Sequence, residues 1–121
     1  MAEVNDQVRQ LVASLNGKHG ILGCLLVGRD GAVICSLPEQ IEVATIGSLS
    51  ATLFSNNDVS IQRMNRGNLV QMTLLTDQGI LHFIETSGHY LVVLTARGQK
   101  INLEGLIKSV DDQGKQLAEV L

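Results

Sequence analysis

The segment "LVQMTLLTDQGILHFIETSGHYLVVLTA" (residues 69–96) decides the fold of this chain. It contains three apolar runs of strand length, at 69–76, 80–86 and 90–96. Only the short connectors "DQG" (77–79) and "SGH" (87–89) separate these runs. Because connectors this short permit only antiparallel hairpins, the segment predicts a three-stranded meander.

A second hairpin is predicted upstream, in "GILGCLLVGRDGAVICSLP" (20–38). Two apolar runs flank Asp30-Gly31, a dipeptide suited to a tight turn with positive φ. We expect strands at 20–28 and 33–37. The first is apolar on both of its sides, which is typical of a strand in a sheet that is covered on both faces.

The two cysteines do not indicate a disulfide framework. If residues 29 and 32 flank the hairpin turn, Cys24 lies diagonal to Cys35 on one face, too far away for easy bridging. We interpret both as small buried hydrophobic residues, and we expect a cytoplasmic protein.

Three helices complete the predicted order of elements. An apolar stripe indicates a helix over 2–16, ended by Asn16-Gly17. Pro38 opens a long helix over 39–65, with a possible kink at the poor helix formers 56–58. Asn102 is a good N-cap for a terminal helix that runs to the end of the chain.

The order α-β-β-α-β-β-β-α predicts one domain over residues 1–121. Its fold class is α+β, with three α/β/α layers and a five-stranded antiparallel sheet.

Composition argues against several classes of function. The net charge is −3 and aromatic residues make up 2% of the chain, so we expect no nucleic-acid partner. No apolar run reaches the length of a membrane span, and no signal peptide is apparent. No phosphate-binding loop occurs, and His19, His82 and His89 are scattered rather than clustered as metal ligands. We therefore expect no cofactor, no metal and no catalytic residue, and a protein that acts by presenting surface rather than as an enzyme.

The long helix is unusually rich in small residues. They recur every four positions at Gly47, Ala51 and Ser55, beside a strip of larger residues, Ile46, Leu49 and Leu53. We expect the larger strip to lie on the sheet and the small strip to admit a second helix closely. The alternative is that the small strip packs on the protein's own sheet.

Strand 69–76 points to a second copy of the chain as the partner. It carries no Pro or charge before Asp77, although exposed edges normally carry such guards. It pairs either with strand 20–28 or with its own copy, and the second choice would bring two long helices together in an isologous homodimer. The predicted dimer interface consists of Gly47, Ala51, Phe54, Ser55, Leu69, Gln71, Met72, Thr73 and Leu75.

Taken in order, four segments resemble the roadblock family of dynein light-chain and GTPase-regulator domains, in its prokaryotic type. They are "GCLLVGRDGAVI", "VATIGSLSATLFS", "RGNLVQMTLLTDQGILHFIETSGHYLVVLTARG" and "NLEGLIKSVDDQGKQLAEVL". The resemblance covers essentially the whole chain. It implies one long helix on one face of the sheet, the two terminal helices on the other, and dimers joined through strand 69–76 and the long helices.

The resemblance also implies a function. Family members are adaptors or activators of Ras-like small GTPases, or parts of motor and signalling complexes, and the activators are thought to reshape the GTPase's own site. We therefore expect a homodimer that binds and regulates a Ras-like GTPase and is a candidate GTPase-activating protein, and we assign no catalytic role to Arg63 or Arg66. The alternatives are a scaffold without effect on hydrolysis, and a small-ligand sensor that uses His82 and Glu85.

Overall fold

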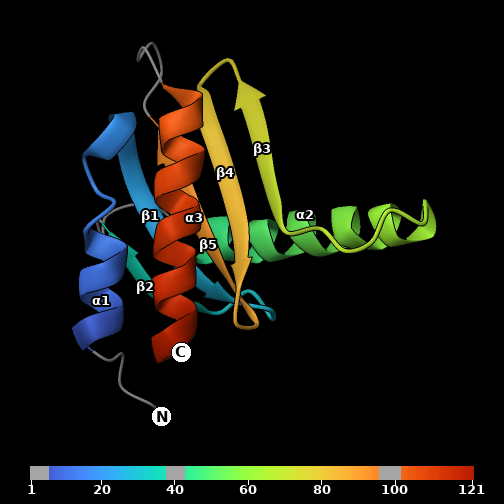
Figure 1. Ribbon diagram of the computed structural model, residues 1–121, viewed down its shortest axis with the longest axis horizontal. Helices are drawn as coiled ribbons and strands as arrows, with labels where there is room; N and C mark the ends of the chain where they lie inside the picture. The colour runs from blue at the N-terminus through green and yellow to red at the C-terminus, as the bar shows by residue number, and fades with distance from the viewer. Residues whose placement is uncertain (1–5, 38–42, 96–101) are drawn as a thin grey trace.

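The computed structural model describes residues 6–37, 43–95 and 102–121 and confirms the predicted three-layer fold (Figure 1). The elements are α1 (Asp6–Ala13), the short 3-10 helix η1 (Lys18–Gly20), β1 (Ile21–Gly28), β2 (Val33–Leu37), α2 (Val43–Arg63), β3 (Gln71–Thr76), β4 (Gly79–Thr86), β5 (His89–Thr95) and α3 (Leu103–Val120). The strands form one antiparallel sheet in the order β2-β1-β5-β4-β3. None of the helices in these ranges is long and apolar enough to cross a membrane.

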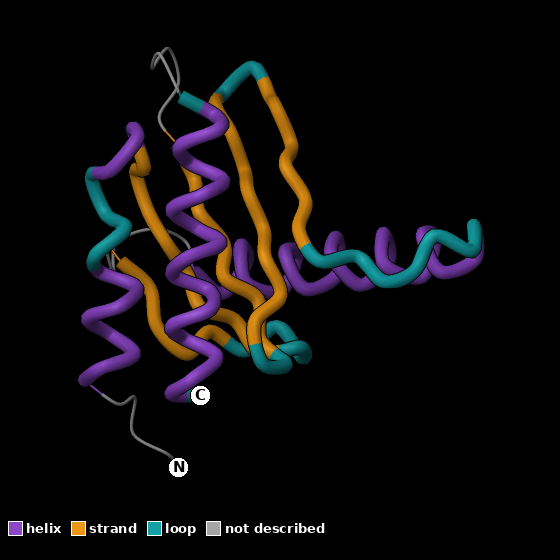
Figure 2. The backbone as a smooth tube through the Cα atoms, viewed as in Figure 1, coloured by secondary structure: helices purple, strands orange, loops and turns teal. Residues whose placement is uncertain are grey.

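The helices lie on opposite faces of the sheet (Figure 2). On one face, α1 and α3 bury Val12 and Leu106 in a core shared with Leu26 of β1. On the other face, α2 buries Phe54 in a second core shared with Val92 of β5. The central strands are therefore covered on both sides, which explains why their sequences are apolar without alternation.

The ends of the helices follow local signals in the sequence. Within the predicted helix 2–16, the structure gives α1 at Asp6–Ala13, and residues 2–5 lie outside the described ranges. Gly17 has φ of 82°, the left-handed conformation expected of a stop signal. The side chain of Asn102 accepts a hydrogen bond from the Gly105 N–H at 3.1 Å, which confirms the predicted N-cap of α3.

The long helix has no kink at residues 56–58. Helix α2 runs without interruption through residues 56–58. Asn57 donates its side-chain amide to the carbonyl of Leu53 at 2.7 Å, so its polar group is satisfied along the helix. The predicted first turn, 39–42, lies outside the described residues.

The β1–β2 hairpin has the predicted register with a longer turn. Cys24 pairs with Leu37 and Leu26 pairs with Cys35, so the two buried cysteines are diagonal neighbours as expected. Burial, with Cys35 nearby, raises the pKa of Cys24 to about 12. The register shifts between Leu26 and Val27, next to a turn that encloses three residues instead of two.

Candidate interaction surface

Strand β3 forms one edge of the sheet. Within the described residues it pairs with β4 only, whereas β1 pairs with β2 and β5. Pairing with strand 20–28 is thereby ruled out within the chain. Because the Glu85 N–H bonds to the carbonyl of Val70, antiparallel alternation turns the backbone groups of Gln71, Thr73 and Leu75 toward the free edge. The edge predicted for self-pairing is present, and Leu75 is 71% exposed on it.

The small residues of α2 lie on the protein's own sheet, contrary to the expected outward orientation. Gly47 and Ala51 are buried. A Cβ added to Gly47 would lie 2.6 Å from Cγ2 of Val33 and 2.9 Å from the carbonyl oxygen of Gly31. Small residues are needed at this part of α2 because the tip of the β1–β2 hairpin lies close to the helix backbone. Phe54 is also buried, with its ring 4.7 Å from that of Tyr90.

Three residues of the predicted interface therefore belong to the protomer's core: Gly47, Ala51 and Phe54. Ser55 remains exposed. The larger strip, expected on the sheet, instead faces outward, with Leu49 58% and Leu53 38% exposed and Ile46 half-buried. Bulky strand residues already fill the space under the helix. Only small helix residues fit against them, so the leucines of α2 lie outside that core.

A row of leucines crosses the α2 side of the sheet at the end that α2 does not cover. Leu74, Leu81 and Leu94 are direct partners across β3, β4 and β5, and all three are half-buried. The helix crosses the opposite end, where Phe54 contacts Tyr90 and Asp58 bonds to Leu69. This leucine row was absent from the predicted interface, although the hairpin connectors alone indicate its register.

On the α1/α3 side, β3 carries two polar side chains, Gln71 and Thr73, before the exposed Leu75. His82 of β4 is fully buried, with its Nδ1 2.6 Å from Oγ1 of Thr73 and its Nε2 3.2 Å from Oε1 of Gln71. Burial lowers the pKa of His82. Thr73 and Gln71, both predicted as interface side chains, are thus engaged within the protomer, and it is their backbone that faces the free edge. Leu69 and Met72, also in the predicted set, are half-buried against the α2 core.

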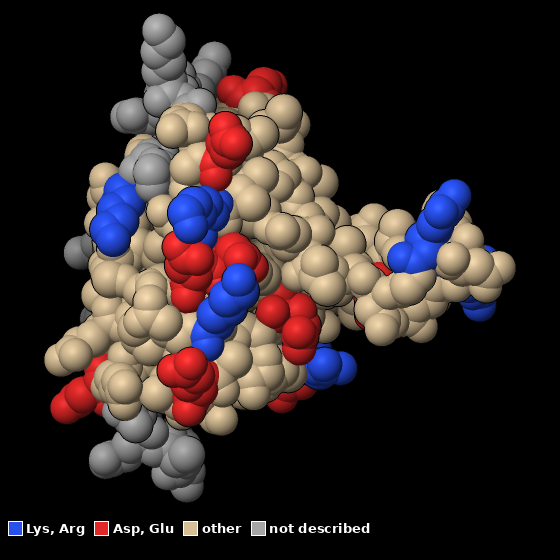
Figure 3. All heavy atoms as spheres, in the orientation of Figure 1, with Lys and Arg blue, Asp and Glu red and all other residues tan. Residues whose placement is uncertain are grey.

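Charges concentrate away from this edge (Figure 3). Helix α3 carries ion pairs between Lys108 and Asp112 at 3.4 Å and between Lys115 and Asp111 at 3.2 Å. In the same view the surface around β3 and the projecting half of α2 is mostly uncharged until the helix end, where Arg63 lies. The charged face is typical of a helix in solvent, and the neutral edge is typical of a contact surface.

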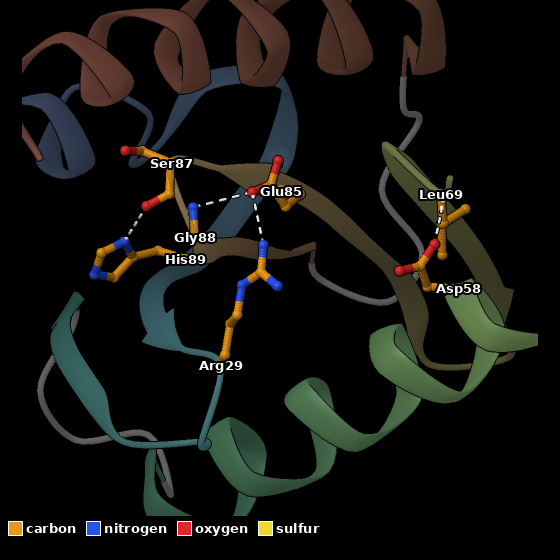
Figure 4. Close-up of polar contacts among 7 residues, drawn as sticks. All are labelled: Arg29, Asp58, Leu69, Glu85, Ser87, Gly88 and His89. Atoms are coloured by element: carbon orange, nitrogen blue, oxygen red, sulfur yellow. Dashed lines mark hydrogen bonds and ion pairs between the residues drawn. The ribbon is translucent and has the colours of Figure 1, made fainter. Parts of the chain in front are cut away.

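A polar cavity of about 430 Å³ lies where α2 meets the other end of the sheet. Asp58 and Gln62 of α2, Glu85 of β4, Tyr90 of β5, Arg29 and Asn68 are among its lining residues. Figure 4 shows Arg29 directed at Glu85, with Nη2 3.5 Å from Oε1. Asp58 accepts a hydrogen bond from the N–H of Leu69 at 2.7 Å. Sequence analysis named only Glu85 among these residues, because the chain segments that meet here lie far apart in sequence.

Comparison with known proteins places the chain in a family. Its residues 7–96 match the Roadblock/LC7 domain. Uncharacterized protein MJ0310 of Methanocaldococcus jannaschii is 30% identical over 102 residues, which cover 84% of this chain and 87% of that protein.

Solved structures share the fold. MglB of Myxococcus xanthus superimposes with a TM-score of 0.84 at 15% identity, over 93% of each chain. A Roadblock/LC7 domain from Streptomyces avermitilis gives 0.83 at 19% identity, over 93% of this chain and 95% of that one. The chain belongs to the Roadblock/LC7 domain family.

Proposed function

We propose that this protein is a homodimeric interaction module that binds a Ras-like small GTPase and regulates it. The observation that carries the proposal is the unpaired edge of β3, flanked by outward leucines of α2 and by the leucine row. An unguarded edge beside apolar side chains is a surface that proteins normally cover.

A two-fold axis perpendicular to the sheet, beside β3, would cover the unpaired edge of β3, the outward leucines of α2 and the leucine row at the same time. It pairs β3 antiparallel with its copy and keeps both α2 helices on the same face. Helix α2 crosses the sheet at the Tyr90 end and projects beyond β3 (Figure 2). The rotation therefore lays the projecting half of each α2 over the partner's opposite end, where the leucine row lies.

The orientation of α2 supports the same arrangement. Positions 54, 58 and 62 line the polar cavity at the Tyr90 end. At 100° per residue, Ile46, Leu49 and Leu53 point to roughly the other side of the helix, toward the leucine row. They would meet the partner's α2 there, so the larger strip replaces the small strip as the proposed helix contact.

The GTPase partner rests on the family resemblance and on the absence of catalytic motifs from the sequence. In this proposal the protein contributes surface, and the chemistry stays in the GTPase's own site. The fold-level likeness to MglB is compatible with this role.

Titration into a Ras-like GTPase from the same genome, loaded with a GTP analogue or with GDP, tests the proposal. We expect tighter binding to one of the two nucleotide states, and a single-turnover assay then measures hydrolysis. Binding without acceleration would indicate the alternative, a scaffold subunit. No binding in either state to a proven cognate GTPase would refute the GTPase partner and leave the dimer to be tested separately.

A further inference from the structure

Tyr90 has an unusual environment at the floor of the polar cavity. Its side chain is only 5% exposed and packs on Phe54. Its hydroxyl has no hydrogen-bond partner among the described residues, yet it is not sealed from solvent and it lines the cavity. Buried tyrosine hydroxyls normally find a partner. A hydroxyl that reaches an open cavity from an otherwise buried side chain is available to hydrogen-bond a ligand there.

The rest of the lining is rich in acceptors. Asp58 accepts one hydrogen bond, from the N–H of Leu69. Oε1 of Glu85 accepts from the N–H of Gly88 at 3.0 Å and lies 3.5 Å from Arg29 (Figure 4). Each carboxylate has a second oxygen without a hydrogen bond among the described residues. Two carboxylates and one arginine leave the lining with an excess negative charge.

The existing arginine does not fill the site. The side chain of Arg29 is 68% exposed and makes one long contact with Glu85. Surface ion pairs of this kind are weak and easily rearranged. The contact does indicate that Glu85 is placed to receive a guanidinium group.

We propose that this cavity binds the side chain of an arginine from a partner protein. A guanidinium group has five N–H donors and no acceptor, which matches a lining of carboxylates and amides. Its flat face also packs against aromatic side chains, and Tyr90 lines this cavity. The cavity lies at the end of the sheet opposite the leucine row, so it remains open in the proposed dimer. The inference does not require the partner to be a GTPase.

Amide NMR shifts test the proposal in the intact protein. The probe is N-acetyl-arginine N-methylamide, which mimics an arginine within a chain, added up to about 20 mM because a lone side chain binds weakly. We expect saturable shifts at the amides of Leu69 and Gly88, which donate to the two carboxylates. The uncharged citrulline analogue should produce none. Equal shifts from both compounds, or no saturation with arginine, would overturn the site.

Variants and a second probe define the site and the source of the arginine. Glu85→Gln and Tyr90→Phe should each weaken binding about fivefold. Asp112→Asn, which removes an exposed carboxylate from α3 and away from the cavity, should have no effect. If one of these two cavity variants does not fold, the binding measured for the other variant still tests the site. Free arginine should bind no better than the capped probe, and saturation by free arginine alone would replace the protein partner with a small-molecule ligand and so overturn the proposal.

Discussion

At the scale of single residues, Gly47 is a tightly constrained position. An alanine there would gain about 1 kcal/mol in helix propensity, but its Cβ would overlap Val33 and the carbonyl of Gly31. Overpacking of this kind costs about 1–3 kcal/mol. We expect Gly47→Ala to lower the free energy of unfolding, as measured by urea denaturation. Thr45→Ala, an exposed change on the same helix, should change it by less than about 0.5 kcal/mol. A more stable Gly47→Ala protein would contradict the close approach of the hairpin.

A second prediction at this scale concerns His82. Burial lowers its pKa from the ordinary 6.5, so the folded protein resists a proton that the unfolded chain accepts. As the pH falls below 6.5, the unfolded state binds more protons, and the free energy of unfolding should fall by at most about 1.4 kcal/mol per pH unit. In His82→Gln this part of the pH dependence should disappear. Parallel stability curves for the two proteins between about pH 5 and pH 8 would contradict the assignment.

At the scale of elements, the buried side of α2 shows the limit of what the sequence can predict. The strands, the hairpin register and the Asn102 cap follow from local chemistry, and the structure confirms them. The buried side of α2 did not follow, because the helix carries apolar residues on two sides. Only the strands beneath it, which already supply Tyr90 and Val92, decide which side fits. The polar cavity was equally hidden, since Arg29 and Glu85 meet only through the folded sheet.

The outward side of α2 supplies a prediction for the helix contact. Leu53→Arg adds a charge to a 38% exposed position, so the protomer should stay folded but become monomeric. Light scattering coupled to size exclusion measures the mass, and circular dichroism checks the fold. Leu121→Glu, at the C-cap of α3, changes a residue of the same exposure and should remain dimeric. An unchanged dimer in Leu53→Arg would place the helix contact elsewhere.

Ala51→Arg, by contrast, should unfold the protomer because Ala51 is buried.

Strand β3 permits a test of backbone pairing alone. Leu75 turns its N–H toward the free edge, so Leu75→Pro removes a donor without breaking a bond to β4. We expect weaker dimerisation by about tenfold or more in sedimentation equilibrium. Leu75→Ala loses the side chain but keeps the N–H, and it separates the two contributions. Equal effects from Leu75→Pro and Leu75→Ala would mean that the edge does not pair through its backbone.

At the scale of the whole molecule, three features of the α2 side lie within one protomer, and the proposed dimer would cover all of them. The leucine row, the outward strip of α2 and the edge of β3 all lie on or beside the same half of the sheet. The charged α1/α3 face lies on the other side of the sheet (Figure 3). In the proposed dimer, the incompletely covered apolar face would make part of the protein's stability depend on association.

This dependence is measurable without any partner other than the protein itself. If folding and dimerisation are coupled, each tenfold increase in protein concentration should add about 1.4 kcal/mol per dimer to the apparent free energy of unfolding. The urea midpoint of the wild-type protein should therefore rise with concentration, whereas that of Leu53→Arg should not. A wild-type midpoint that stays constant, with a mass of one chain at micromolar concentration, would show that the leucine row and the strip of α2 are tolerated in water by a monomer. In that case the surface would have to be assigned to a different protein, and the two-fold arrangement would be abandoned.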